Sequence, residues 1–217
     1  NTALSLMAET LAMAFWGTAV AATIAFFLAP LATGQLLWRG YLPHSPRGRG
    51  LYRLLSLCVL ATSRFLLQVF RALPELVWAL IFILWVGPGA FAGALAIAAH
   101  TIGILGRLYS ESFDEAEPVA VANLEAAGGG VIGRWGYGVL PQIAPRILAF
   151  TLFRFEVNVR ATAMVGFVGA GGIGNAIHTA ISLFHMNDLA GLLVVLLVTV
   201  GVVDILGDQI RQKILAN

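Results

Sequence analysis

Four polar side chains at alternate positions of an otherwise apolar stretch are the residues of this sequence best suited to chemistry: Arg154, Glu156, Asn158 and Arg160. Guanidinium groups match tetrahedral oxyanions, so Arg154, helped by Asn158, is a candidate transient site for a small oxyanion. Glu156 and Arg160 are four residues apart with the glutamate first, which favours an ion pair within one helix. The alternative is that all four residues form a network that only holds helices together.

Other motifs do not support catalysis in this chain. Residues 169–174 fit the glycine spacing of a dinucleotide fingerprint, but the required strand and the acidic residue about 20 positions later are missing. The histidines lack metal-ligand spacing, and the single Cys58 excludes an internal disulfide and a multi-cysteine metal site. The chain contains no Walker-type phosphate loop, so any ATP hydrolysis must take place in a partner. We expect no catalytic residue, no metal site and no cofactor here.

The composition places these residues in a membrane. Of 217 residues, 59% are apolar and 11% are charged, whereas about 25% are charged in a soluble domain. A bilayer takes about 20 apolar residues to cross, and helices satisfy the backbone there. The alternation typical of a β-barrel is absent. We predict an all-α membrane protein, a single transmembrane domain over 1–217, with about five spans: 9–37, 65–87, 90–112, 144–168 and 187–211.

The positions of the span boundaries follow from helix-breaking residues. The segment 87–89, Gly-Pro-Gly, separates the second span from the third, and Pro74 is expected to kink the second span. Residues 51–64 have polar side chains on one helical face, which predicts a helix at the membrane interface.

A charge at mid-bilayer costs on the order of 3 kcal/mol, so the polar residues of the fourth span must face the protein interior or a water-filled path.

Basic residues predict the orientation. They follow the first span, flank the polar insert between the third and fourth spans, and follow the last span, whereas segments 1–8, 87–90 and 169–186 contain neither lysine nor arginine. By the positive-inside tendency, the insert and the C-terminus are cytoplasmic and the N-terminus of this chain is outside. We expect a multi-pass protein of the bacterial cytoplasmic (inner) membrane.

The polar insert, residues 114–141, is the second candidate site. It combines an acidic start, the glycine run 128–130 and a closing Leu140-Pro141 between two apolar stretches. Acidic side chains and Pro118 suit the first turn of a helix, which predicts one or two short helices lying along the membrane. The alternative is a solvated loop. A polar segment has no reason to stay in lipid, so we expect a soluble partner to dock on it.

The insert resembles the cytoplasmic "EAA" loop of binding-protein-dependent ABC importer permeases. That signature is Glu-Ala-Ala, three residues, Gly, nine residues, Ile, one residue and Leu-Pro. Counting back from Leu140-Pro141 places the signature glycine at Gly128, its glutamate at Ala122 and its isoleucine at Gly138. The literal Glu125-Ala126-Ala127 string is therefore out of register. The resemblance implies a coupling helix that contacts an ATPase through Ala122, Asn123, Leu124, Glu125, Ala126, Ala127 and Gly128.

Four further segments are similar to phosphonate-importer permeases: residues 71–80, 100–111, 152–160 and 165–174. The resemblance covers about 51–212, and the Arg-Phe-Glu-Val-Asn-Val-Arg run at 154–160 is its most specific part. Methionine-importer permeases share the five-span plan and the glycine-rich run, so a permease of that type is the alternative. The resemblance implies that the substrate is a phosphonate or a related small oxyanion and that Arg154, Glu156, Asn158 and Arg160 lie along its path.

The same resemblance implies the partners. We expect two cytoplasmic ATPase subunits that hold ATP and Mg, a second permease copy or a homologue, an extracytoplasmic substrate-binding protein and membrane lipid, with no nucleic acid. Two other classes remain open. An ion-coupled secondary transporter would use Glu156 or Asp204 and work without an ATPase, and a membrane-embedded enzyme would need a convergent set of reactive side chains that the sequence does not offer.

Overall fold

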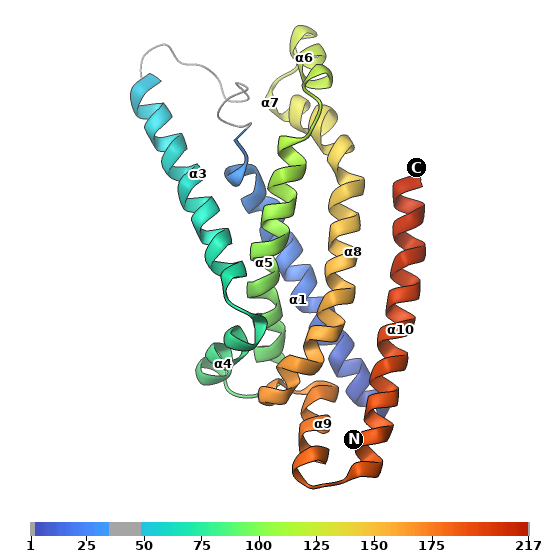
Figure 1. The fold of residues 1–217 in the computed structure, drawn as a ribbon. Helices are drawn as coiled ribbons and strands as arrows, with labels where there is room; N and C mark the ends of the chain where they lie inside the picture. Colours follow the sequence, from blue (N-terminus) through green and yellow to red (C-terminus); the bar gives the residue numbers. More distant parts are fainter. Residues whose placement is uncertain (1–2, 35–48, 217) are drawn as a thin grey trace.

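The structure, a computed structural model, describes residues 3–34 and 49–216, and all regular secondary structure in these ranges is helical. The all-α prediction is confirmed. The elements form an elongated bundle (Figure 1). In chain order they are α1 (Ala3–Ala32), α3 (Arg49–Ala72), α4 (Glu75–Val86), α5 (Ala90–Asp114), α6 (Pro118–Ala126), α7 (Val131–Gly133), the π-helical turn η1 (Arg134–Val139), α8 (Leu140–Val165), the π-helical turn η2 (Gly166–Ala170), α9 (Gly172–Ser182) and α10 (Met186–Ala216).

Among the described residues, four to five candidate membrane spans are present. Four helical segments are long and apolar enough to cross a bilayer: Ala3–Ala32, Leu54–Ala72, Ala90–Asp114 and Met186–Ile214. A fifth candidate is the pair Arg134–Ala170 and Gly172–Ser182, which is bent by 57°. The described helices therefore agree with the expected number of spans. The end of the first expected span, at 37, lies outside the described residues.

The second expected span differs in the structure. Instead of an interfacial helix over 51–64 and one helix over 65–87, α3 runs without a break from Arg49 to Ala72, and α4 is a separate helix. Pro74 explains the break, because it has no N–H to donate and disfavours helical geometry in the residue before it. The carbonyl of Pro74 then accepts the N–H of Val77 at 3.0 Å and starts α4.

Small side chains allow α1 to pack closely against the centre of the bundle. Ala21, Ala25 and Ala29 of α1 are fully buried, and a Cβ on Gly17 would lie 2.9 Å from Ile97 of α5. Small residues let membrane helices approach one another in this way. One core cluster runs from Ala25 and Ala29 through Leu105, Tyr109 and Phe113 of α5 to Val121 of α6. The polar insert is thus packed onto the bundle through a continuous apolar core.

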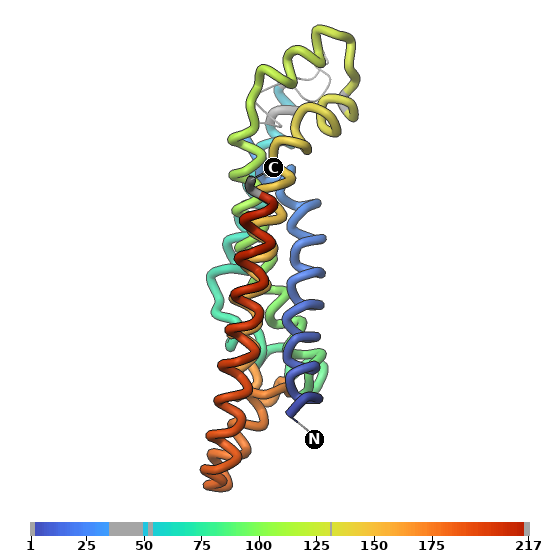
Figure 2. Tube along the Cα trace, turned by 90° about the vertical axis from the view of Figure 1, so that its right-hand side faces the viewer, coloured from blue at the N-terminus to red at the C-terminus, as the bar shows by residue number. Residues whose placement is uncertain are grey.

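The two ends of the bundle carry different parts of the chain. α6, α7 and the C-terminus lie at one end, called here the coupling end, and the N-terminus, α4 and α9 lie at the other, called the far end (Figure 1). The view turned by 90° shows the same separation (Figure 2). α10 lies along one side of the bundle and exposes several large apolar side chains, among them Leu193, Leu197 and Ile205.

Candidate functional site

The polar insert folds into α6, a glycine turn, α7 and η1. Gly128 has φ +82°, a backbone conformation that glycine adopts without strain. The N–H of Gly129 donates to the carbonyl of Leu124 at 2.8 Å and closes the turn after α6. Gly138 lies against α6 so closely that a Cβ there would be 3.1 Å from the Leu124 side chain and 3.2 Å from Val121. The glycines therefore allow α6 to fold back onto η1.

Polar contacts fix the insert to α5 and α8. The N–H of Glu117 donates to Oε1 of Gln142 at 2.8 Å, and Nε2 of the same Gln142 donates to the carbonyl of Gly138 at 2.6 Å. Glu115 forms an ion pair with Arg146 of α8. These contacts connect both ends of the insert to the helices that continue into the bundle, so a displacement of α6 would act on α5 and α8.

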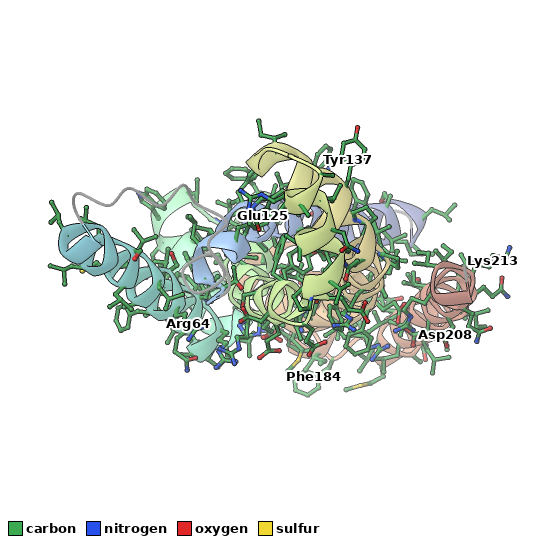
Figure 3. The ribbon with its side chains drawn as sticks, turned by 90° about the horizontal axis from the view of Figure 1, so that it is seen from above. Arg64, Glu125, Tyr137, Phe184, Asp208 and Lys213 are labelled. Carbon is green, nitrogen blue, oxygen red and sulfur yellow. The ribbon has the colours of Figure 1, made fainter. Side chains whose placement is uncertain are left out.

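The seven residues expected to contact an ATPase lie together on α6 and the turn after it. All are exposed except Leu124, which is half-buried against Gly138. Sequence reasoning missed three apolar side chains of the same insert that are also exposed: Ile132 is 89% exposed, Tyr137 is 81% exposed, and Val119 is exposed as well. Tyr137 projects away from the ribbon at the coupling end (Figure 3). Apolar residues within a polar insert were the signal available in the sequence.

The four polar residues of α8 separate into two groups. Glu156 and Arg160 do not pair with each other, so that expectation is wrong. The Oε2 of Glu156 accepts a hydrogen bond from Nη2 of Arg211 at 3.1 Å, and Nη2 of Arg160 donates to Oδ1 of Asp204 at 2.7 Å. Both partners belong to α10. Spacing within a helix permits a pair but does not enforce one when a neighbouring helix offers opposite charges.

Arg154 and Asn158 face the other way, toward α1 and α5. Asn158 is buried and donates from Nδ2 to the hydroxyl groups of Thr18, at 2.8 Å, and Thr101, at 3.1 Å. Arg154 donates from Nη2 to Oδ1 of Asn158 at 3.2 Å, and its other contact is a 3.5 Å approach to Thr101. Asn158 thus joins three helices at the middle of the bundle and holds Arg154 there.

The guanidinium of Arg154 keeps unused hydrogen-bonding capacity. Its Nε is buried and has no hydrogen-bond partner, and among the described residues no carboxylate lies within ion-pair distance of it. Glu75 of α4 acts on it electrostatically from farther away, and the Glu75 carboxylate lies 3.5 Å from Nε2 of His100. Glu75 and His100 are the residues near this site that sequence reasoning missed. Arg154 is thus a half-buried cation at mid-bundle, with Asn158 and Thr101 buried beside it and Glu75 as a more distant negative charge.

The glycine-rich segment 169–174 makes a bend and forms no dinucleotide loop. Gly169 and Gly171 have φ values of +98° and +85°, where η2 turns into α9. Gly174 lies so close to α8 that a Cβ would be 2.1 Å from the carbonyl oxygen of Ala163. The hydroxyl of Thr10 accepts the N–H of Ile173 at 2.9 Å and satisfies the first turn of α9. These glycines serve a tight turn at the far end.

Comparisons with known proteins agree with this architecture. Residues 59–215 match the family described as "Binding-protein-dependent transport system inner membrane component". The chain is 31% identical over 204 residues to the phosphite transport system permease protein PtxC of Stutzerimonas stutzeri, covering 94% of this chain and 68% of that protein. It is 31% identical over 210 residues to the phosphate-import permease protein PhnE of Mycolicibacterium smegmatis, covering 97% of this chain and 36% of that protein.

Solved structures show the same fold. An inward-facing form of the MetNI methionine ABC transporter matches with a TM-score of 0.70 at 20% identity, covering 98% of this chain and 94% of the other. An amino acid ABC transporter matches with a TM-score of 0.74 at 16% identity, covering 97% and 93%. The family match covers the bent fourth span, the insert and α10, and the fold is shared over nearly the whole chain. The chain therefore belongs to the binding-protein-dependent transport system inner membrane components, the permease subunits of ABC importers.

Proposed function

We propose that this chain forms the translocation pathway of an ATP-driven importer for a phosphonate or a related small oxyanion, together with a second copy or a homologue. The observation that carries the proposal is the insert: it is fixed to α5 and α8 and presents exposed apolar side chains, Ile132 and Tyr137, at one end of a membrane bundle. Apolar side chains that are exposed on a polar insert are suited to burial against another protein. The curated relatives named for phosphite and phosphate transport support the substrate class.

In this proposal two cytoplasmic ATPases bind the inserts of the two permease subunits. ATP and Mg are held by the ATPases, and this chain contributes no catalytic group. When the ATPases close on ATP, α6 moves with them. The apolar core from Val121 through Phe113 and Tyr109 to Ala25 connects that motion to α5 and α1. A packed core switches between discrete arrangements rather than deforming gradually. Movement of α6 would therefore shift the pathway between inward-open and outward-open states.

Arg154 is the proposed transient contact for the oxyanion. A guanidinium binds tetrahedral oxyanions through two parallel hydrogen bonds, and the unpartnered Nε of Arg154 supplies one such donor. Asn158 accepts a hydrogen bond from Arg154 and positions it. The amide group of Asn158 in turn donates to the hydroxyl groups of Thr18 and Thr101. Glu156 and Arg160 form ion pairs with residues of α10. Their proposed role along the pathway is therefore to hold α8 and α10 together.

The orientation is part of the proposal. The coupling end lies in the cytoplasm with the C-terminus, and the N-terminus of this chain lies outside, because basic residues gather around the insert and the C-terminus. The binding protein would then meet the far end. A groove there is lined by residues of α1, the 88–89 turn, α9, α10 and the turn between these two helices, including Glu9, Asn175 and His185.

The docking part of the proposal is tested by purifying the tagged chain with its ATPase. Changing both Ile132 and Tyr137 to alanine should remove the ATPase from the complex, because the exposed apolar side chains would no longer be buried against it. The matched control is Phe184→Ala, an exposed aromatic in the turn between α9 and α10, which should leave the ATPase bound. No ATPase with the unchanged chain, and uptake into vesicles without ATP, would instead identify a secondary transporter.

The substrate part is tested by uptake of phosphite and of methylphosphonate into proteoliposomes that contain the complete importer. Arg154→Gln should lower uptake at least about tenfold, the effect of losing roughly 1.4 kcal/mol of binding, with unchanged protein level and ATPase retention. Arg107→Gln, an exposed arginine paired with Glu111 near the coupling end, is the control. Uptake that persists unchanged in the Arg154→Gln importer would remove Arg154 from the pathway.

A further inference from the structure

An ion pair inside the insert joins the last turn of α6 to η1. Oε1 of Glu125 lies 3.0 Å from Nη1 of Arg134. The two partners have different surroundings: the Arg134 side chain is 10% exposed, and the Glu125 side chain is 63% exposed. The pair closes across the glycine turn 128–130, so it connects two helical segments that the turn alone would leave free to change their angle.

Glu125 is the group that compensates the charge of Arg134. The Nε of Arg134 is buried and has no hydrogen-bond partner, and within the described residues Glu125 is the carboxylate that pairs with this guanidinium. Removing the carboxylate would leave a buried cation without a counter-charge, which is unfavourable. The neighbouring pair of Glu115 and Arg146 differs, because 63% and 47% of those side chains are exposed and water can replace either partner.

On its outer side, the turn between α6 and η1 is held by backbone hydrogen bonds and by this ion pair. A Cβ added at Gly128 or at Gly130 would meet no atom within 4 Å, so the turn itself is not packed against the protein. On the side of α6 that faces the bundle, Val121 and Leu124 approach Gly138, and Val121 shares an apolar cluster with Val139 and Trp135 of η1. The apolar cluster holds the inner side of α6, and the Glu125–Arg134 pair holds its outer side.

We propose that the Glu125–Arg134 pair positions α6 for energy coupling, and that Glu125 serves η1 rather than the ATPase. This inference rests on the proposed function of the insert as the ATPase contact. Loss of the pair would leave the exposed apolar side chains of Ile132 and Tyr137 available for binding the ATPase. It would loosen α6, so that movement of the ATPase is passed less completely to η1 and α8. Glu125 and Arg134 are thus positioning residues.

The test uses the complete importer in proteoliposomes, with methylphosphonate as the transported probe. Two quantities are measured for each variant: the ATPase retained on purification, and the methylphosphonate imported per ATP hydrolysed. For Glu125→Gln we expect full ATPase retention and import per ATP lowered about tenfold. A tenfold change corresponds to about 1.4 kcal/mol less stabilisation of the position in which α6 transmits the ATPase movement. Glu125→Asp, which keeps the charge, should retain most of the import, and Glu111→Gln, whose exposed carboxylate pairs with Arg107 within α5, is the matched control that should change neither quantity.

A variant in which the two charges are exchanged distinguishes a positioning role of the pair from a general loss of structure. The double variant Glu125→Arg with Arg134→Glu should recover import per ATP relative to either single change, because the attraction across the turn is restored. If Glu125→Gln loses the ATPase as the Ile132 and Tyr137 variant does, Glu125 is itself the contact and the inference is wrong. Unchanged import per ATP in Glu125→Gln would also refute it. An unchanged chain that retains no ATPase would refute the proposed function before any variant is compared.

Discussion

Replacing Arg211 by glutamine should destabilise the protein far more than replacing Glu156 by glutamine, although both changes break the same ion pair. Glu156 is 4% exposed between α8 and α10, and its Oε1 has no hydrogen-bond partner. Arg211 is 21% exposed, lies over the ring of Phe153 and also contacts Asp208. After Arg211→Gln the buried carboxylate loses its hydrogen-bonded counter-charge and keeps only the weaker influence of Arg160, whereas after Glu156→Gln the arginine keeps Asp208 and access to water.

The magnitudes follow from this difference in burial. Breaking a buried pair by removing one partner costs about 3–5 kcal/mol, and we expect about 3 kcal/mol for Arg211→Gln because its end of the pair is partly exposed. Loss of one hydrogen bond to a charged group costs about 1.5 kcal/mol for Glu156→Gln, the low end of the usual range, because Arg211 keeps its other contacts. The double variant with both glutamines buries no charge, so it should be more stable than Arg211→Gln by about 1–2 kcal/mol.

The assay is unfolding of the purified chain in mixed detergent micelles, followed by tryptophan fluorescence as the denaturing detergent is titrated. Arg107→Gln is the control, because 47% of that side chain is exposed and its pair with Glu111 should be worth less than about 1 kcal/mol. Equal losses for Arg211→Gln and Glu156→Gln, or losses that simply add in the double variant, would refute the assignment of Glu156 as the buried partner that needs Arg211.

The remaining predictions concern close helix packing and are read out in the same unfolding assay. Gly207→Ala should destabilise the protein by about 1–3 kcal/mol, because a Cβ there would lie 2.0 Å from Oε1 of Glu156. Gly201→Ala on the same helix is the control: its Cβ would meet no atom within 4 Å, so the change should be neutral or stabilising by up to about 1 kcal/mol. Gly103→Ala should destabilise at least as much as Gly207→Ala, because its Cβ would lie 2.4 Å from a backbone nitrogen of α3; an unaffected variant would show that α3 does not pack there. Thr10→Val should cost about 1 kcal/mol through loss of the hydrogen bond to the first turn of α9, and Thr23→Val, an exposed threonine that bonds within α1, serves as its control.

The sequence was informative where one physical constraint dominates. Long uncharged runs specify helices in lipid, because the backbone must satisfy its own hydrogen bonds there. The polar insert was recognisable for the same reason, since it interrupts such runs. α5 spans Ala90–Asp114 where 90–112 was expected, and α10 spans Met186–Ala216 where 187–211 was expected.

The second helical segment shows where sequence patterns mislead. Residues 51–64 have polar side chains on one face, which suggested an interfacial helix, and Pro74 suggested a kink within a longer helix. In the structure α3 continues through the first segment and ends at Ala72, so Pro74 separates two helices. Composition permits either arrangement, and the packing of α3 against α5 through Gly103 favours the observed one.

The sequence by itself determined that the chain is a helical membrane protein with a polar insert, because hydrophobicity and backbone hydrogen bonding act locally along the chain. Only the tertiary structure decided which charges meet. Glu156 and Arg160 were expected to pair with each other, yet α10, which follows about 50 residues later in the sequence, supplies Arg211 and Asp204. Ion pairs depend on distances of a few ångströms between side chains, and those distances are fixed by helix packing rather than by spacing along one helix.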